Sequence, residues 1–136
     1  MDLSRYFQRK RGLGVLATAD ARGRVTIALY ARPHFVDGKT VAFIMADRLS
    51  HRNLRENLYA AYLFAEEGEG YRGVRLYLTM TGEEKDSPRI GSLRRSAGKR
   101  RIPGTRFLVS FRVDRVLPLV GAGKIGRAKV ARAPRQ

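Results

Sequence analysis

The sequence predicts a mainly β fold with short α-helices, arranged as a six-stranded antiparallel β-barrel. Six segments are rich in apolar, β-branched and aromatic residues, which is typical of strands. Most connections between these segments are short, and several contain glycine turns, which favours antiparallel neighbours. The chain lacks the strand–helix–strand rhythm of a parallel sheet. Six strands with so many apolar positions usually close into a barrel.

The N-terminal half is expected to contain one short helix and three strands. Residues 2–10 can form the helix, because three apolar residues fall at positions i, i+3 and i+4 on one face, and glycines follow to end it. A polar glycine turn joins the first two strands into a hairpin, and an Asp-Gly pair marks the turn before the third. The third strand is almost continuously apolar, which indicates burial on both faces. The strands are expected at residues 14–20, 25–31 and 40–46.

The C-terminal half is expected to contain two more short helices and three more strands. A helix of one and a half to two turns fits after residue 47, and a second begins with Ser-Pro over residues 87–97. The clearest alternation of apolar and polar residues in the chain lies in residues 74–84. A proline, Pro118, ends the last strand. The strands are expected at residues 58–67, 74–84 and 105–120.

The composition is strongly basic for a chain of 136 residues, with a net charge of +16 and a pI of about 11.3. Such an excess favours an anionic partner: nucleic acid, a phosphate-bearing small molecule or an acidic membrane. Many of the cations lie in residues 94–106 and 121–136, which contain no acids and are typical of a loop and a frayed end. We expect one domain over residues 1–120 and a basic, flexible tail over residues 121–136.

Several classes of protein are disfavoured by what the sequence lacks. Without cysteine the chain cannot form disulfides, a thiolate nucleophile or a cysteine metal site, and two histidines do not suggest a histidine-rich one. The N-terminus has no apolar signal region, and no apolar stretch reaches the roughly 18 residues that a membrane span needs. We expect a cytoplasmic protein that contains no bound metal and does not enter a membrane.

Residues 47–57, DRLSHRNLREN, join the third strand to the following helix and are rich in cations and polar groups. In one interpretation, Asp47 or Ser50 caps the helix and the arginines form a solvated face. In the other, the free N–H groups of the first turn and the Ser50 hydroxyl bind an anion, and Arg48 and Arg52 reach it because they lie four residues apart. The residues alone leave both interpretations open.

A longer pattern surrounds this segment: GVLATADARGRVTIALYARPHFVDGKTVAFIMADRLSHRNLRENLYAAYLF, residues 14–64. Its order is LATAD, a glycine turn, an aromatic-rich strand, xDGxT, an apolar strand and a basic turn into NLxxN. This order and spacing resemble the pyridoxamine 5′-phosphate oxidase-like family, the FMN-binding split β-barrels. The resemblance covers about residues 13–84 well and residues 105–120 loosely. It implies a six-stranded antiparallel split β-barrel and a homodimer with FMN at the subunit interface.

The resemblance also implies which residues hold the cofactor. The phosphate ligands would be Arg48, Ser50 and Arg52, with His51 and Asn53 beside them. The isoalloxazine contacts would come from Ala28, Leu29 and Tyr30 of the second strand and from Phe43, Ile44 and Met45 of the third. Many relatives carry Lys where this chain carries Ser50. The C-terminal substrate-binding segment of a true pyridoxamine phosphate oxidase is absent, so vitamin B6 oxidation is not expected and no catalytic residue is assigned.

Two functions from different classes follow. The first is an FMN-binding oxidoreductase acting on an unidentified small molecule, with another flavin, a deazaflavin or haem as less favoured ligands. The second is a basic β-barrel that binds nucleic acid or another polyanion without redox chemistry, through cations and strand tyrosines such as Tyr30, Tyr62 and Tyr77. The basic tail could bind polyanions nonspecifically in either case.

Overall fold

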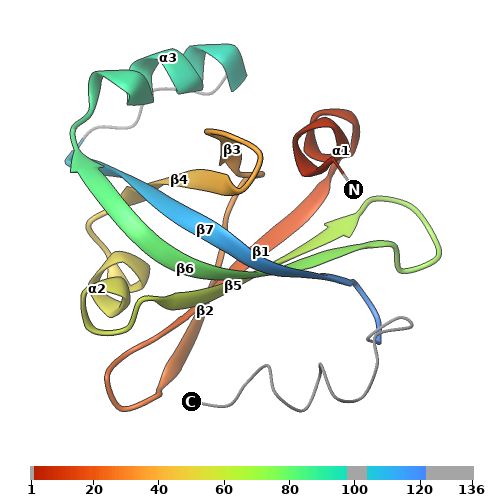
Figure 1. The fold of residues 1–136 in the computed structure, drawn as a ribbon, viewed down its shortest axis with the longest axis horizontal. Helices are drawn as coiled ribbons and strands as arrows, with labels where there is room; N and C mark the ends of the chain where they lie inside the picture. Colours follow the sequence, from red (N-terminus) through yellow and green to blue (C-terminus); the bar gives the residue numbers. More distant parts are fainter. Residues whose placement is uncertain (1, 98–103, 122–136) are drawn as a thin grey trace.

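The computed structural model describes residues 2–97 and 104–121, which fold into one antiparallel sheet with three helices (Figure 1). The strand order is β2-β1-β5-β6-β7-β4-β3, and every pair is antiparallel. The predicted mainly β, antiparallel split-barrel fold is thereby confirmed. The elements are α1 (Leu3–Arg9), β1 (Gly12–Ala19), β2 (Val25–Leu29), β3 (His34–Phe35), β4 (Thr40–Ala46), α2 (Leu49–Glu56), β5 (Tyr59–Glu66), β6 (Gly73–Lys85), α3 (Pro88–Ala97) and β7 (Arg106–Pro118).

The six predicted strands are all present, and their ends lie within two residues of the predicted ends. The sheet has a seventh strand, β3, inside the predicted connection over residues 32–39, where it pairs with Val41 and Ala42 of β4. Two residues are too few to show a periodic pattern, so only the pairing identifies this strand. Helix α1 ends at Arg9, before the glycines expected to end it, and β1 begins at Gly12, two residues before the predicted start at Gly14. Of the predicted tail over residues 121–136, residues 122–136 lie outside the described residues.

The core lies between the curved strands and is closed at one end by α1 (Figure 1). Leu3 and Phe7 of α1 pack into it, as the predicted apolar face of that helix requires. Along β6 the alternation holds, because Leu76 and Leu78 are buried while Tyr77 between them is partly exposed. β4 is covered on both faces, as its continuous apolar run predicted. The buried members of this core are Leu3, Phe7, Leu16, Val41, Phe43, Met45, Leu54, Ala60, Tyr62, Phe64, Val74, Leu76, Leu78, Phe107, Val109 and Phe111.

The side of the sheet that faces away from this core differs between its two halves. Over β4 and β7, α3 lies on the sheet and packs Ile90 and Leu93 against Ile44 and Leu108 (Figure 1). Over β2, β1, β5 and β6, no described helix covers the equivalent apolar side chains. We call this second surface the outer face. Its partly or largely exposed apolar members are Leu13, Val25, Ile27, Leu29, Tyr59, Leu63 and Tyr77.

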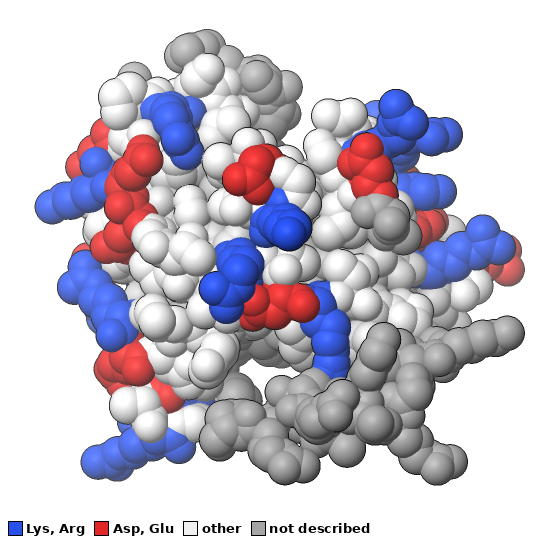
Figure 2. All heavy atoms as spheres, viewed as in Figure 1, with Lys and Arg blue, Asp and Glu red and all other residues white. Residues whose placement is uncertain are grey.

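Each helix within residues 2–97 and 104–121 is too short and too polar to span a lipid bilayer. Charged side chains of both signs are interspersed on the face drawn in Figure 2, and the described residues there form no continuous basic patch.

Candidate functional site

The β4–α2 junction brings a helix N-terminus to the rim of the barrel. The cap position of α2 is Arg48, whose backbone is extended and whose side chain makes no capping hydrogen bond. The predicted cap by Asp47 or Ser50 is therefore wrong, whereas the arginines of the same interpretation, Arg48, Arg52 and Arg55, are exposed as it expected. The backbone N–H groups of the first turn can therefore donate to another acceptor, and their partial positive charge favours an anion.

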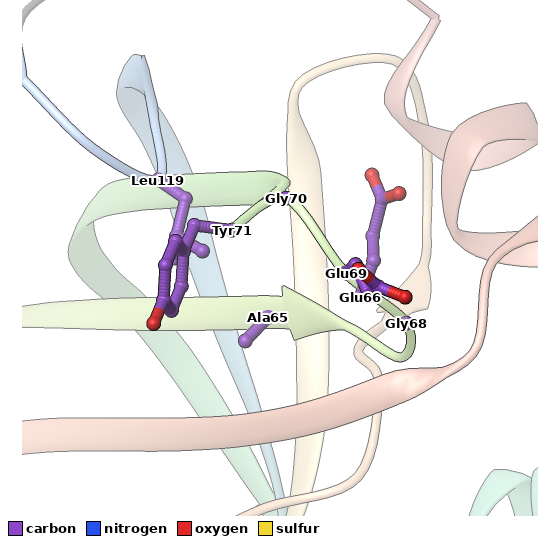
Figure 3. Close-up of a pocket in the computed structure, with 7 residues that line it drawn as sticks. All are labelled: Ala65, Glu66, Gly68, Glu69, Gly70, Tyr71 and Leu119. Carbon is purple, nitrogen blue, oxygen red and sulfur yellow. The ribbon is translucent and has the colours of Figure 1, made fainter.

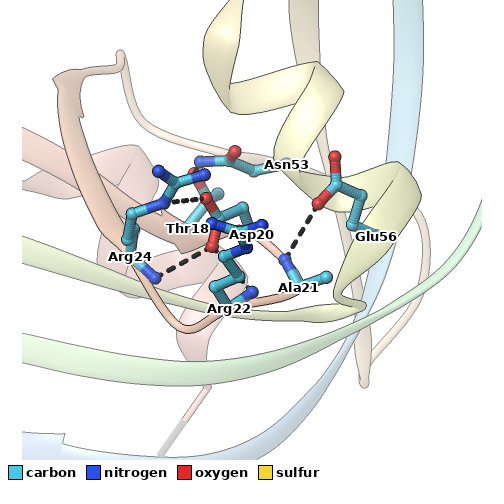
Figure 4. A network of polar contacts seen from close by, with 7 residues as sticks. All are labelled: Thr18, Asp20, Ala21, Arg22, Arg24, Asn53 and Glu56. Atoms are coloured by element: carbon cyan, nitrogen blue, oxygen red, sulfur yellow. Dashed lines mark hydrogen bonds and ion pairs between the residues drawn. The ribbon is translucent and has the colours of Figure 1, made fainter.

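Hydrogen bonds from Asn53 and Glu56 hold α2 against β1 and the turn that follows it. The Asn53 amide donates to the Thr18 hydroxyl of β1 at 3.0 Å, and both side chains are buried. The Glu56 carboxylate accepts the backbone N–H of Ala21, in the turn after β1, at 2.9 Å (Figure 4). In that turn the Asp20 carboxylate accepts two backbone N–H groups, and the bond from Arg24 is the main cause that lowers its pKa. These contacts fix the helix to the β1–β2 hairpin.

His51 holds a second side of α2. Its ring is fully buried and stacks on Phe107 of β7 with centroids 3.8 Å apart, and its Nε2 lies 2.6 Å from Oε1 of Glu83 on β6. Its Nδ1 has no hydrogen-bond partner, although Oδ1 of Asp47 lies 3.8 Å away. Of the residues expected beside the phosphate, His51 and Asn53 thus face protein groups.

Two of the remaining predicted phosphate ligands, Arg48 and Ser50, lie near Tyr30, just beyond the end of β2. Ser50 is almost fully buried, whereas Arg48 and Arg52 are exposed. Burial raises the pKa of the Tyr30 phenol, while its interaction with the Ser50 hydroxyl and the positive charge of Arg48 oppose that rise. All three groups therefore lie together. We call Tyr30, Arg48 and Ser50 the cradle; Arg52 stands at its rim, 3.7 Å from the Asp47 carboxylate.

The family resemblance implied a flavin contact for Tyr30, and the sequence did not predict that its hydroxyl lies near Ser50. The signal was present only as two polar residues twenty positions apart, which local periodicity cannot connect. A hydroxyl, a second hydroxyl, a guanidinium and free helix N–H groups form a donor set that suits phosphate oxygens.

Beside the cradle, β2 and β4 offer a ligand their backbones more than their side chains. Phe43 and Met45 of β4 point into the core, Ile44 packs toward α3, and the Tyr30 ring meets Phe43 edge-on with centroids 5.8 Å apart. β3 pairs with Val41 and Ala42 only, so no described strand covers that edge of β4 beyond them. On β2, Ala28 is half-buried on the side of Tyr30, while Leu29 points to the outer face. Ring contacts along β4 would therefore be to its backbone.

A buried tyrosine fixes the end of β2. The Tyr62 hydroxyl lies 3.1 Å from the carbonyl oxygens of both Tyr30 and Ala31, and it donates its proton to this pair. Burial raises the pKa of Tyr62, which keeps the donor protonated. Gly14 permits this approach, since a Cβ there would lie 2.0 Å from the Tyr62 hydroxyl oxygen. The sequence analysis named Tyr62 only as a tyrosine for polyanion binding, but its ring is fully buried. A strand tyrosine and a strand glycine carry no local sign of this contact.

A cavity of about 350 Å³ lies at the β5–β6 loop, lined by Ala65, Glu66, Gly68, Glu69, Gly70, Tyr71 and Leu119 (Figure 3). It is at the opposite end of β5 from α2. Its Glu66 carboxylate already accepts the Tyr6 hydroxyl at 2.5 Å, and burial raises the pKa of Tyr6. Two glutamates in the lining do not suit a phosphate, so this cavity is not part of the cradle.

The chain matches no family model, and no curated protein matches its sequence. Solved structures do share its fold. An FMN-binding protein from Syntrophomonas wolfei matches at 14% identity and a TM-score of 0.73, over 88% of this chain and 85% of that one. HupZ from Group A Streptococcus matches at 20% identity and a TM-score of 0.68, over 90% and 95%. A candidate pyridoxamine 5′-phosphate oxidase from Lactobacillus delbrueckii matches at 16% identity and a TM-score of 0.63, over 86% and 92%.

Further structures of this fold are described as an F420 reductase, an FAD-binding protein from Mesorhizobium loti and the haem storage protein HutZ from Vibrio cholerae. At these identities the likeness shows the fold alone. This chain has the fold of the pyridoxamine 5′-phosphate oxidase-like proteins, as its sequence predicted, and proteins with this fold bind several flavin-type or related ligands.

Proposed function

We propose that this chain, with its pyridoxamine 5′-phosphate oxidase-like fold, binds FMN and acts as an oxidoreductase on a small molecule. The observation that carries the proposal is the cradle: Tyr30, Ser50 and Arg48 converge at a helix N-terminus whose first turn has no side-chain cap. An anion there gains charge-assisted hydrogen bonds and the helix dipole together.

In this proposal the phosphate lies at the start of α2 and the flavin ring lies between β2 and β4. Arg48, Ser50 and Arg52 bind the phosphate, with His51 and Asn53 holding the helix that carries them. Ala28, Leu29 and Tyr30, and Phe43, Ile44 and Met45, line the ring, mostly through backbone. The flavin supplies the redox chemistry when bound; the protein binds it, orients it and limits the access of water. The substrate and the electron donor are not identified by any of these residues.

A homodimer completes the proposal, because the outer face offers an apolar surface beside the cradle. Val25, Ile27 and Leu29 expose 70–76% of their surface on the same strand that leads into Tyr30. A contiguous apolar surface of this kind is typical of an interface, and a second copy of the chain is the simplest occupant. A cofactor bound beside β2 would then lie near the subunit boundary.

The absorption spectrum of the freshly purified protein tests the proposal first. We expect flavin bands, or their appearance after addition of FMN. Titration of the apoprotein with FMN, FAD, F420 and haem identifies the preferred ligand. A protein that takes up none of them would contradict the proposal.

Arginine variants test the phosphate assignment. Arg48→Ala should weaken FMN binding by about 10- to 100-fold, since a hydrogen bond to a charged group contributes about 1.5–3 kcal/mol. Arg52→Ala should also weaken FMN binding, but by less, because Arg52 lies at the rim of the cradle. Riboflavin, which lacks the phosphate, should be almost unaffected. The matched control is Arg55→Ala, an exposed arginine in the last turn of the same helix. Equal losses for FMN and riboflavin would contradict the assignment.

Polyanion binding is the second candidate function, and the charge of +16 favours it. A chain truncated after Pro118 should then lose affinity for a nucleic acid and keep flavin. Affinity that disappears between low and moderate salt would mark nonspecific attraction only.

A further inference from the structure

His51 is the most confined polar side chain of α2. It is fully buried, stacked on Phe107 with an interplanar angle of 14°, and bonded at 2.6 Å to a single carboxylate, Glu83. Loss of that bond would leave a polar atom of the buried imidazole without a partner, which is costly. The stack and the bond together allow the ring only one placement.

That placement determines how α2 is rotated about its axis. Successive residues of a helix point about 100° apart, so fixing His51 toward β6 and β7 also fixes the direction of its neighbour Ser50. Asn53, bonded to Thr18 of β1, holds the helix from another side. With both contacts in place, Ser50 is buried on the side of Tyr30. Arg48 and Arg52 remain on the exposed side of the helix.

We infer that His51 is a positioning residue for the cradle: through Glu83 and Phe107 it sets the rotation of α2, and so determines how strongly the site prefers a phosphate-bearing ligand over its phosphate-free form. The ligand preference in this inference rests on the proposed function. Its geometric part, that the His51–Glu83 contact sets how Ser50 lies beside Tyr30, needs no ligand.

Asp47 links the same contact to the rim of the cradle. Its Oδ1 lies 3.8 Å from Nδ1 of His51 and 3.7 Å from Nε of Arg52. It therefore lies between the buried ring and the exposed guanidinium. When the ring leaves its place, the carboxylate loses one neighbour and Arg52 loses a fixed partner, so the effect reaches the rim as well as Ser50.

Glu83→Ala tests the inference, with Glu84→Ala as the matched control. Glu84 is the next residue on β6, exposed, and its nearest charged partner is Arg89 at 3.9 Å. Binding of FMN and of riboflavin is measured for each protein. We expect Glu83→Ala to weaken FMN about 10-fold more than riboflavin, Glu83→Gln to restore most of the loss because its amide oxygen still accepts from the imidazole, and Glu84→Ala to change neither.

A second readout needs no flavin. In protein labelled with ¹³C at the tyrosine rings, Tyr30→Phe identifies the Tyr30 signal, and Glu83→Ala should shift that signal while Glu84→Ala leaves it in place. A role in stability alone would lower the unfolding midpoint without moving either the Tyr30 signal or the FMN-to-riboflavin ratio.

The two readouts separate the possible failures. An unmoved Tyr30 signal, or equal weakening of FMN and riboflavin by Glu83→Ala, overturns the inference. If the unaltered protein binds neither flavin, the proposed function fails and the ligand preference fails with it. A Tyr30 shift confined to Glu83→Ala would then still support the geometric part.

Discussion

Two groups of apolar side chains point away from the core on the outside of the sheet, and they differ in how far they are exposed. Leu108, under α3, is 1% exposed, whereas Ile27 on the outer face is 71% exposed. α3 lies in the connection between β6 and β7, so it can reach the surface of β7 and its neighbour β4. No described element extends over the outer face of β2 and β1. The difference teaches that the chain's own helix covers one apolar surface, whereas the described residues leave the other exposed.

The largest effect is expected from a charge on the outer face. Ile27→Asp should leave the fold intact, because the side chain is exposed, and should raise the dissociation constant of the proposed homodimer by about 1000-fold. A twofold-symmetric interface receives the aspartate twice. Sedimentation equilibrium measures the change. Val36→Asp is the control, since Val36 is also exposed but lies beyond β3 in the turn before β4. Equal masses for the two variants would show that the outer face is not the interface.

A cavity under α3 should produce the next largest effect. Leu108→Ala should lower the free energy of unfolding by about 2–5 kcal/mol, because the leucine is buried between β7 and α3. Leu29→Ala should lower it by less than about 0.5 kcal/mol when both are measured by urea unfolding in the Ile27→Asp background, where association does not contribute. Similar losses for both would mean that the two surfaces are equally covered.

The two sides of β5 offer a smaller contrast. Tyr62→Phe removes the hydroxyl that holds the end of β2 and should cost about 1 kcal/mol of unfolding free energy. It should also weaken FMN severalfold, because the backbone that carries Tyr30 loses its support. Tyr59→Phe, on the outer face, should change neither quantity. Unfolding and flavin titrations of both variants check this, and indistinguishable results would contradict the role given to Tyr62.

The smallest effect is expected in the turn that ends the β1–β2 hairpin. The backbone hydrogen bond from Arg24 is the first cause that lowers the pKa of Asp20, so the carboxylate stabilises the folded state when ionised. This contribution is present above the ordinary pKa of an aspartate and is lost as the pH falls through the lowered value. Asp20→Asn should therefore reduce the acid sensitivity of the urea midpoint slightly. Identical acid profiles for the two proteins would show that these bonds do not stabilise the hairpin.

Much of the fold could be predicted because local residue patterns determine most of its helices and strands. Residues 74–84 alternate, residues 40–46 are continuously apolar, and glycine or Asp-Gly turns separate the strands, so six strands and three helices followed directly. The position of Arg48 and Ser50 at the start of a helix followed in the same way. The ligands assigned to them are a proposal that these local patterns support and do not test.

The sequence by itself determined six of the seven strands, the three helices, the antiparallel arrangement and the apolar character of both faces of β4. Only the tertiary structure decided that His51 faces Glu83, that Tyr62 reaches the carbonyl of Tyr30, and that α3 covers one apolar surface and not the other. The first two contacts each join residues 32 positions apart. Local patterns extend over a few residues, whereas such contacts depend on how distant strands come together, so the direction of a polar side chain is set by packing and cannot be read from its neighbours in sequence.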